Sequence, residues 1–91
     1  MAPAASGQRG DALITVLFFG PVAERVGVSR LDIGHADGMR LCDVRAQLQQ
    51  RYPQAFEIVS IVAVNGEQVI DGALPLADRS EVVFMSKFSG G

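Results

Sequence analysis

The chain has 91 residues, 48% of them apolar, with eight basic and ten acidic residues and a formal net charge of −2. This length allows one compact domain, and the lack of a Lys/Arg cluster argues against nucleic acid as a partner. The only cysteine, Cys42, and the only histidine, His35, exclude an internal disulfide and argue against a metal site within one chain.

Residues 1–10 are rich in Ala, Pro, Ser and Gly and have no apolar periodicity. We expect them to form a disordered N-terminal extension before a folded domain over residues 11–87. They lack the continuous apolar stretch of a secretory signal, and no later apolar run approaches the ~20 residues that span a bilayer. The expectation is therefore a cytoplasmic, soluble protein with no membrane partner.

The first folded segments are predicted to be two strands. Residues 12–19 (ALITVLFF) form an apolar, β-rich run that predicts a strand buried on both faces near the centre of a sheet. Residues 22–27 predict a short turn of helix or a loop. Residues 29–33 alternate polar and apolar side chains as a half-buried strand does, and residues 34–38 are expected to form a loop.

An apolar stripe predicts one main helix after this loop. Its members are spaced at i, i+3, i+7 and i+11, and they are Leu41, Val44, Leu48 and Tyr52. Pro53 is expected to stop the helix. The helix start lacks a Ser, Thr or Asp at the usual position, so we expect Asp37 to cap it from upstream and Asp43 to act only through the helix dipole.

A β-hairpin is predicted next. Residues 58–64 form an apolar strand pattern, and Asn65-Gly66 after it is a strong hairpin signal because both residues tolerate a positive φ. Residues 67–70 are then the returning strand.

The last predicted strand covers residues 81–85 (EVVFM), and it follows turns at Asp71-Gly72 and Asp78-Arg79-Ser80. From Lys87 onward the chain is expected to have nothing left to pair with. The predicted order of strands and helix gives an α+β fold, in which one main helix covers a mixed sheet of about five strands. This is the β-grasp arrangement of ubiquitin.

The chain finishes on Gly90-Gly91, shortly after this strand. Residues without a Cβ pass through a narrow channel and accept any backbone conformation. If residues 88–91 are extended, they carry the terminal carboxylate up to roughly 14 Å beyond the sheet. A carboxylate joined to AMP becomes an acyl group that a sulfur nucleophile attacks, leaving a thiocarboxylate. Residues 88–91 are thus a candidate flexible, sulfur-carrying tail, with a frayed end of small residues as the alternative.

Three segments of the sequence resemble the small subunit of molybdopterin synthase, the MoaD family of ubiquitin-like sulfur carriers. They are LFFGPVAERVG at 17–27, VAVNGEQV at 62–69 and LADRSEVVFMSKFSGG at 76–91. The residues that match the family pattern are Phe18, Phe19, Glu24, Gly27, Val64, Asn65, Glu81, Val82, Gly90 and Gly91. Many family members carry Pro-Pro where this chain has Ser86-Lys87. Because proline fixes φ, we expect a more flexible tail here.

The resemblance implies that Gly91 is adenylated by an ATP-using enzyme of the ubiquitin-activating type and then thiocarboxylated with sulfur from a donor. It implies that the tail, with Lys87, Phe88, Ser89 and Gly90, inserts into the large subunit of molybdopterin synthase in a heterotetramer. Two rounds of sulfur transfer there convert cyclic pyranopterin monophosphate to molybdopterin.

By the same resemblance, the chain is no enzyme on its own but a non-catalytic sulfur donor that binds no cofactor. Nucleotide binding then belongs to the activating partner, since the chain has no phosphate-binding loop motif.

Apolar residues near the tail predict a protein interface. Phe18, Phe19, Met85 and Phe88 are the members of this group, and the place of Phe18 in an alternating strand favours the core for it. Phe19 and Met85 are interface candidates within the folded domain, and Phe88, which lies past the last strand, is a better interface candidate than Phe18.

Three polar residues receive plainer interpretations. For Lys87, a solvated lysine at a strand end is commoner than one paired with a partner's carboxylate. Cys42 is expected to be a small half-buried residue rather than a reactive thiol, because no partner base is in sight. His35 is expected to be a surface residue.

Other functions remain open at this point. The chain resembles carriers that supply sulfur to thiamine, cysteine or another compound, since all share the fold and the Gly-Gly end. Nothing in the sequence excludes a protein modifier joined through Gly91 to lysines of target proteins. A plain binding module with an idle tail is the third alternative.

Overall fold

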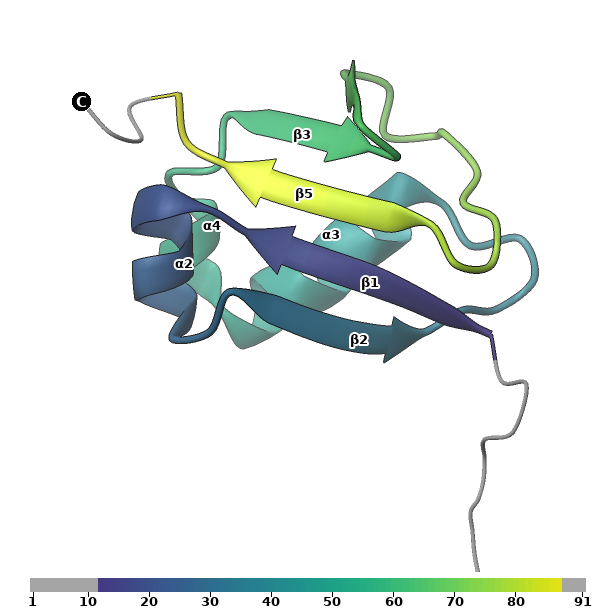
Figure 1. Cartoon of the computed structure of the whole chain (residues 1–91), viewed down its shortest axis with the longest axis horizontal. Coiled ribbons are helices and arrows are strands. Elements are labelled where there is room, and N and C mark those ends of the chain that lie inside the picture. The colour runs from purple at the N-terminus through teal and green to yellow at the C-terminus, as the bar shows by residue number, and fades with distance from the viewer. Residues whose placement is uncertain (1–11, 88–91) are drawn as a thin grey trace, which may run out of the picture.

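The computed structural model describes residues 12–87. Its five strands form one mixed sheet in the order β2-β1-β5-β3-β4. The helices lie on one face of this sheet, with α2 and α4 together at one end (Figure 1). The predicted β-grasp arrangement is therefore confirmed, whereas the expected extension over 1–10 and the tail over 88–91 lie outside the described residues.

The strands β1 (Leu13–Phe18) and β2 (Arg30–Gly34) pair antiparallel. Alternate residues of β1 face the helices, and Ile14, Val16 and Phe18 are at most 1% exposed. The expectation that β1 is buried on both faces is wrong, because its other residues are only partly covered on a face without helices. β1 does lie inside the sheet, between β2 and β5.

The helix α2 (Gly20–Val26) follows β1 directly. It ends at Gly27, whose φ of 99° lies in the left-handed region that glycine adopts without a Cβ clash, and whose N–H donates to the carbonyl of Ala23 at 2.8 Å. This turn reverses the chain and lets it return along β1 as β2.

The main helix α3 (Leu41–Arg51) buries Leu41, Val44 and Leu48 against the sheet, as the apolar stripe predicts. Its start is capped differently from the expectation. The N–H of Arg40 donates to Oδ2 of Asp43 at 2.9 Å, so the cap is Asp43 rather than Asp37.

A short helix, α4 (Pro53–Phe56), follows α3 and was not expected from the sequence. Proline stops one helix and also fits the first position of the next, because its fixed φ is helical and its missing N–H has no helical partner there. The strand after it, β3 (Ile61–Val64), begins three residues later than the predicted start at Ile58. Ile58 and Val59 pack against the core from a loop, which explains their apolar character.

The hairpin between β3 and β4 (Glu67–Val69) forms at the predicted position. Asn65 and Gly66 have φ values of 51° and 87°, as a two-residue hairpin turn requires. The returning strand ends at Val69 rather than at the predicted Ile70, which is 96% exposed.

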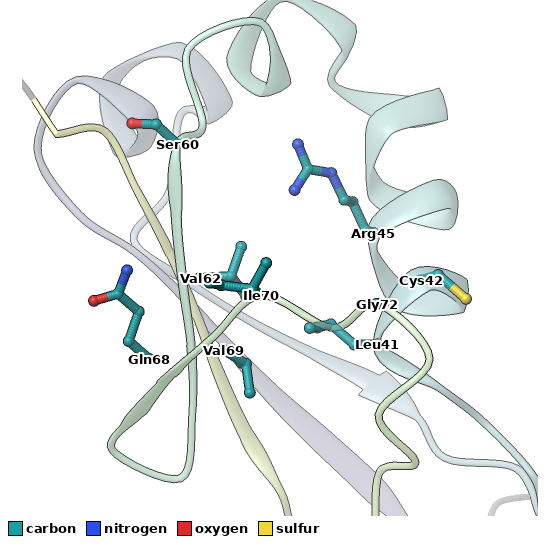
Figure 2. Close-up of a pocket in the computed structure, with 9 residues that line it drawn as sticks. All are labelled: Leu41, Cys42, Arg45, Ser60, Val62, Gln68, Val69, Ile70 and Gly72. Carbon is teal, nitrogen blue, oxygen red and sulfur yellow. The ribbon is translucent and has the colours of Figure 1, made fainter.

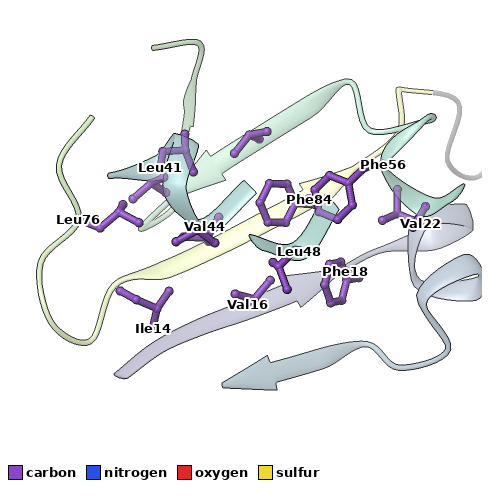
Figure 3. Close-up of a cluster of buried hydrophobic side chains, with 14 residues drawn as sticks. Ile14, Val16, Phe18, Val22, Leu41, Val44, Leu48, Phe56, Leu76 and Phe84 are labelled. Atoms are coloured by element: carbon purple, nitrogen blue, oxygen red, sulfur yellow. The ribbon is translucent and has the colours of Figure 1, made fainter. Parts of the chain in front are cut away.

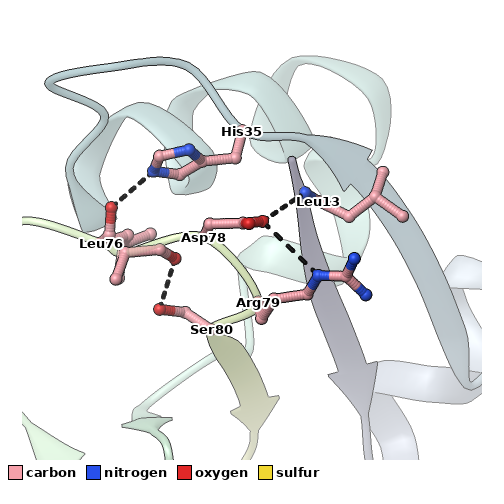
Figure 4. A network of polar contacts seen from close by, with 7 residues as sticks. Leu13, His35, Leu76, Asp78, Arg79 and Ser80 are labelled. Atoms are coloured by element: carbon pink, nitrogen blue, oxygen red, sulfur yellow. Dashed lines mark hydrogen bonds and ion pairs between the residues drawn. The ribbon is translucent and has the colours of Figure 1, made fainter. Parts of the chain in front are cut away.

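The last strand, β5 (Glu81–Met85), occupies the centre of the sheet. It pairs parallel with β1 and antiparallel with β3. At its start, the Asp78 carboxylate accepts the Leu13 N–H at 2.9 Å and joins the turn before β5 to the first residue of β1 (Figure 4).

His35 lies beside the turn before β5, and its contacts there differ from the expectation. Its side chain is half-buried, and Nε2 donates to the carbonyl of Leu76 at 2.6 Å (Figure 4). His35 is therefore a structural link between the loop after β2 and the loop before β5 rather than a plain surface residue.

The core lies between α3 and the sheet, and Phe84 on β5 is at its middle (Figure 3). Its ring meets Phe56 edge-on at a centroid distance of 4.9 Å and stacks near Phe18 at 6.1 Å. Aromatic contacts of this kind add to the free energy of apolar burial. Phe84 thus links the central strand to α4 and to β1.

Replacing Phe84 by Ala should lower the free energy of unfolding by about 3–5 kcal/mol, because it opens a cavity at the centre of the core. Phe19→Ala is the matched control, since Phe19 is 48% exposed and its loss should cost far less. Urea unfolding followed by circular dichroism measures both variants. Equal losses would contradict this assignment of the core.

Candidate functional site

The described chain ends at Lys87, where the predicted tail begins. Ser86 follows the central strand and is 4% exposed. The N–H of Lys87 donates to Oγ of Ser60 at 2.8 Å, and the N–H of Ser60 donates to the carbonyl of Met85 at 3.0 Å. Ser60 therefore binds the chain on both sides of Ser86 and fixes the position from which the tail leaves the domain.

These contacts bear on two expectations about the tail. Lys87 does have a backbone partner, so the expectation that nothing is left to pair with fails at this residue. The expectation of a more flexible tail stays a prediction, because it concerns residues 88–91; at residues 86–87 a buried serine and a hydrogen bond hold the chain. The Lys87 side chain is exposed, whereas Phe88, Ser89, Gly90 and Gly91 lie outside the described residues.

We call Ser86 and Lys87 the tail root. Their position follows from the parallel pairing of β1 and β5. Phe18 at the end of β1 is in register with Phe84 near the end of β5. The tail root and the start of α2 therefore lie at the same end of the domain, together with α4 (Figure 1). We call this the tail end of the domain.

An apolar patch lies beside the tail root on the sheet face that carries no helix. Leu17, Val83 and Ala63 are in register across the three central strands, and Ile61 pairs with Met85 one step nearer the tail. Phe19 continues this face, since its backbone is extended and its N–H donates to the carbonyl of Phe84 at 3.2 Å. We call these six residues the outer patch: Leu17, Phe19, Ile61, Ala63, Val83 and Met85.

The structure separates the apolar residues predicted near the tail. Phe18 is 1% exposed, so its favoured assignment to the core is confirmed. Phe19 is 48% exposed and Met85 is half-buried, and both belong to the outer patch. Their role in an interface stays a prediction, and Phe88 lies outside the described residues.

A hollow of about 280 Å³ lies between the start of α3 and the edge strand β4 (Figure 2). Arg45 and Ser60 line it, together with Ile70 on the rim. Cys42 also lines it, but its thiol is exposed and points away from the other labelled side chains in Figure 2. The expectation of a half-buried Cys42 is therefore wrong.

The described residues offer little chemistry of their own. Among residues 12–87 no group of three or more His, Cys, Asp or Glu side chains is placed to hold a metal ion. No helix within the described range is both long and apolar enough to cross a bilayer. What this region does provide is a fixed position for Ser86 and Lys87 beside an apolar surface.

Sequence reasoning missed Ser60. It stands in an apolar segment between Val59 and Ile61 and belongs to no motif. Its role depends on the pairing of residues 60 and 85–87, which are far apart in the chain. No local pattern carries that information.

Comparisons with known proteins agree on the family and the fold. The ThiS family matches residues 16–91. The putative molybdopterin converting factor subunit 1 from Pyrococcus furiosus is similar in structure, with a TM-score of 0.73 at 22% identity over 82% of this chain and 97% of that chain. Among curated proteins, none matches this sequence.

Two further structures are similar in fold. SAMP1 from Haloferax volcanii gives a TM-score of 0.72 at 20% identity, over 87% of this chain and 99% of that chain. A chain in the complex of subunits 1 and 2 of molybdopterin-converting factor from Helicobacter pylori gives 0.65 at 26% identity, over 87% and 99%. The fold is thus shared by SAMP1 and by subunits of molybdopterin converting factors.

Ser60→Ala should increase the exchange rate of the Lys87 amide hydrogen by roughly threefold to tenfold, because it removes a hydrogen bond worth about 1 kcal/mol. Ser60→Thr is the matched control, since it keeps the hydroxyl acceptor. Hydrogen exchange measured by NMR reports this amide directly. An unchanged rate in Ser60→Ala would show that the bond does not hold the tail root.

Proposed function

Because this chain belongs to the ThiS family, we propose that it is a sulfur carrier in molybdenum cofactor biosynthesis. Its C-terminal Gly91 is the reactive group. The protein delivers sulfur in complex with the large subunit of molybdopterin synthase and converts cyclic pyranopterin monophosphate to molybdopterin. The observation that carries this proposal is the chain end, which leaves the central strand at a fixed point next to the outer patch.

The chemistry takes place on the terminal carboxylate. One of its oxygens attacks the α-phosphate of ATP on an adenylating enzyme, and pyrophosphate leaves. A hydrosulfide equivalent from the sulfur donor then attacks the acyl carbon, a C–S bond forms and AMP leaves. The product is a thiocarboxylate on Gly91. When its sulfur has bonded to the acceptor, water attacks the acyl carbon, the C–S bond breaks and the carboxylate is restored. Two rounds supply the two sulfurs of the dithiolene.

The outer patch is the proposed docking surface for the large subunit. Exposed apolar groups mark protein interfaces, and Phe19 offers an aromatic side chain that is 48% exposed. Four other members of the patch are half-buried, and Val83 is only 7% exposed. The similar Helicobacter pylori chain comes from a complex of the two subunits of molybdopterin-converting factor, which supports a large-subunit partner here.

In this proposal the chain is no enzyme by itself. Lys87, Phe88, Ser89 and Gly90 lead Gly91 into the partner's site, and the catalytic side chains belong to the partner. The carrier binds no cofactor, and nucleotide enters only through the adenylating enzyme. The working assembly is a heterotetramer in the cytoplasm, where ATP is supplied.

A protein modifier is the second candidate. SAMP1 stands for small archaeal modifier protein 1. Its structure is as similar to this chain as that of the molybdopterin converting factor subunit, with TM-scores of 0.72 and 0.73. A modifier uses the same activated glycine but passes it to a lysine amine rather than to sulfur. Carriers for thiamine or cysteine share the sulfur step and differ only in the acceptor.

Incubation with ATP, an adenylating enzyme and sulfide should raise the intact mass of this chain by the difference between one sulfur and one oxygen atom. Mass spectrometry of the full chain measures this change. The added mass should disappear when the large subunit and cyclic pyranopterin monophosphate are added and dithiolene product forms. A chain without Gly91 is the control and should gain no sulfur.

The same experiment separates the alternatives. Sulfur gained but not discharged to the pterin would assign the chain to another sulfur pathway. Conjugates of higher mass without thiocarboxylate would assign it to protein modification. No mass change at all would contradict the carrier proposal.

Phe19→Asp should weaken binding of the large subunit by roughly tenfold or more, because it places a charge in the centre of the docking surface. Ile70→Asp is the matched control, since Ile70 is also a large exposed apolar residue but belongs to the rim of the hollow beside β4. Calorimetric titration of the large subunit measures both. Equal effects would contradict docking through the outer patch.

A further inference from the structure

Charged side chains are unevenly distributed between the two ends of the described domain. At the tail end, four basic residues face two acidic ones: Arg25, Arg45, Arg51 and Lys87 against Glu24 and Glu57. Arg45 belongs to this group because its guanidinium lies 5.9 Å from the centre of the Phe56 ring in α4. At the opposite end, six acidic residues face two basic ones: Asp37, Asp43, Glu67, Asp71, Asp78 and Glu81 against Arg40 and Arg79. The one other described pair, Arg30 and Asp32, is a mutual ion pair at 3.6 Å.

The fold determines this placement. Glu81 opens β5, and Glu67 follows the hairpin turn beside it. Asp78 binds the N–H of Leu13 at the start of β1, and Arg40 forms a β-bridge with Pro75. All of these lie where β1 and β5 begin, whereas α2 and α4 lie where the two strands finish (Figure 1). A chain with a net charge of −2 therefore has a basic tail end.

A hollow of about 290 Å³ concentrates this positive charge at the junction of α3 and α4. Arg25 and Arg51 line it, with Tyr52, Pro53 and Gln54 between them. The Arg51 guanidinium lies over the Tyr52 ring at 5.2 Å, and Nη1 of Arg25 donates to the carbonyl of Gln54 at 3.0 Å. Both guanidinium groups are thereby oriented along one hollow.

The charge of Arg25 is only weakly compensated within the chain. Glu57 lies 3.7 Å from Nη1, but its side chain is 71% exposed and that of Arg25 is 45% exposed. Ion pairs this exposed contribute about 0–1 kcal/mol, because water competes for both partners. A carboxylate from another molecule therefore displaces Glu57 at little cost.

We propose that the hollow between Arg25 and Arg51 binds acidic side chains of the adenylating enzyme that receives the tail. This inference rests on the proposed function, which supplies a partner that must approach the tail end. Four residues beyond Lys87 reach roughly 14 Å, so that partner comes within about one to two Debye lengths of both arginines. Carboxylates around the entrance of its active site are attracted to the basic end and repelled by the acidic end. The charge pattern thus orients the carrier with its tail forward.

The first test needs no sulfur chemistry. A hexaglutamate peptide titrated into the full chain should shift the backbone amide signals of Arg51, Gln54 and Glu57 in NMR spectra. Inorganic phosphate and sodium chloride at equal ionic strength are the comparison. Equal shifts with phosphate would overturn the assignment to an acidic protein segment and leave a general anion site.

The second test uses two variants with equal loss of charge. Arg25→Gln/Arg51→Gln removes the basic hollow, and Arg40→Gln/Arg79→Gln removes two positive charges from the opposite end. The association rate constant with the adenylating enzyme should fall roughly tenfold in the first variant at low salt, and the effect should shrink as salt is added. The second variant should lose much less. Urea midpoints confirm that both variants are folded.

The outcomes separate this inference from the proposed function. Equal loss in both variants would show that only net charge matters and would overturn the orienting role of the hollow. If the adenylating enzyme fails to activate even the unaltered chain, the carrier proposal fails. The hexaglutamate titration still decides in that case whether the hollow takes acidic segments.

Discussion

The parallel pairing of β1 with β5 is the constraint on which the rest of this structure depends. The last strand of the chain lies at the centre of the sheet, between β1 and β3, so every other element is placed before it in sequence and around it in space. Because a parallel pair needs a long connection, the helices and the remaining strands all belong to that connection. Ser86 and Lys87 are thereby held directly after the central strand.

This arrangement joins a rigid base to a short reactive end. Phe84 holds β5 in the core through Phe56 and Phe18, and Ser60 extends that hold to Lys87. Ordering the backbone of one residue costs about 1–2 kcal/mol in entropy. A residue that is already fixed in the free protein does not add this cost to the free energy of binding. The hydrogen bond between Lys87 and Ser60 therefore reduces the backbone entropy that Lys87 has left to lose when a partner binds.

Local patterns in the sequence predicted those parts of the fold that local physics determines. The Asn65-Gly66 turn and the stripe of Leu41, Val44 and Leu48 depend on near neighbours, and both form as predicted. Pro53 is read equally well as a helix stop or a helix start, so α4 was missed. The proposed role of Gly91 rests on a terminal motif and a family resemblance, and it stays a prediction. Three features arise only when distant segments meet, and no periodicity encodes them. They are the hydrogen bonds of Ser60, the contact of the half-buried His35 with Leu76, and the separation of charge.

The fold alone does not distinguish the molybdopterin converting factor subunit from SAMP1, because the two structures are nearly equally similar to this chain. Selection of a partner must therefore depend on surfaces that vary while the sheet stays constant. The outer patch and the basic hollow are two such surfaces, and they contribute different terms. Apolar burial on the outer patch supplies affinity without direction, since it depends on area. The charge separation supplies direction without much affinity, because long-range attraction acts on orientation and encounter rate before contact. For the carrier that we propose, this division means that charge would steer the tail end toward the partner before contact and apolar burial would hold the two proteins together only after contact.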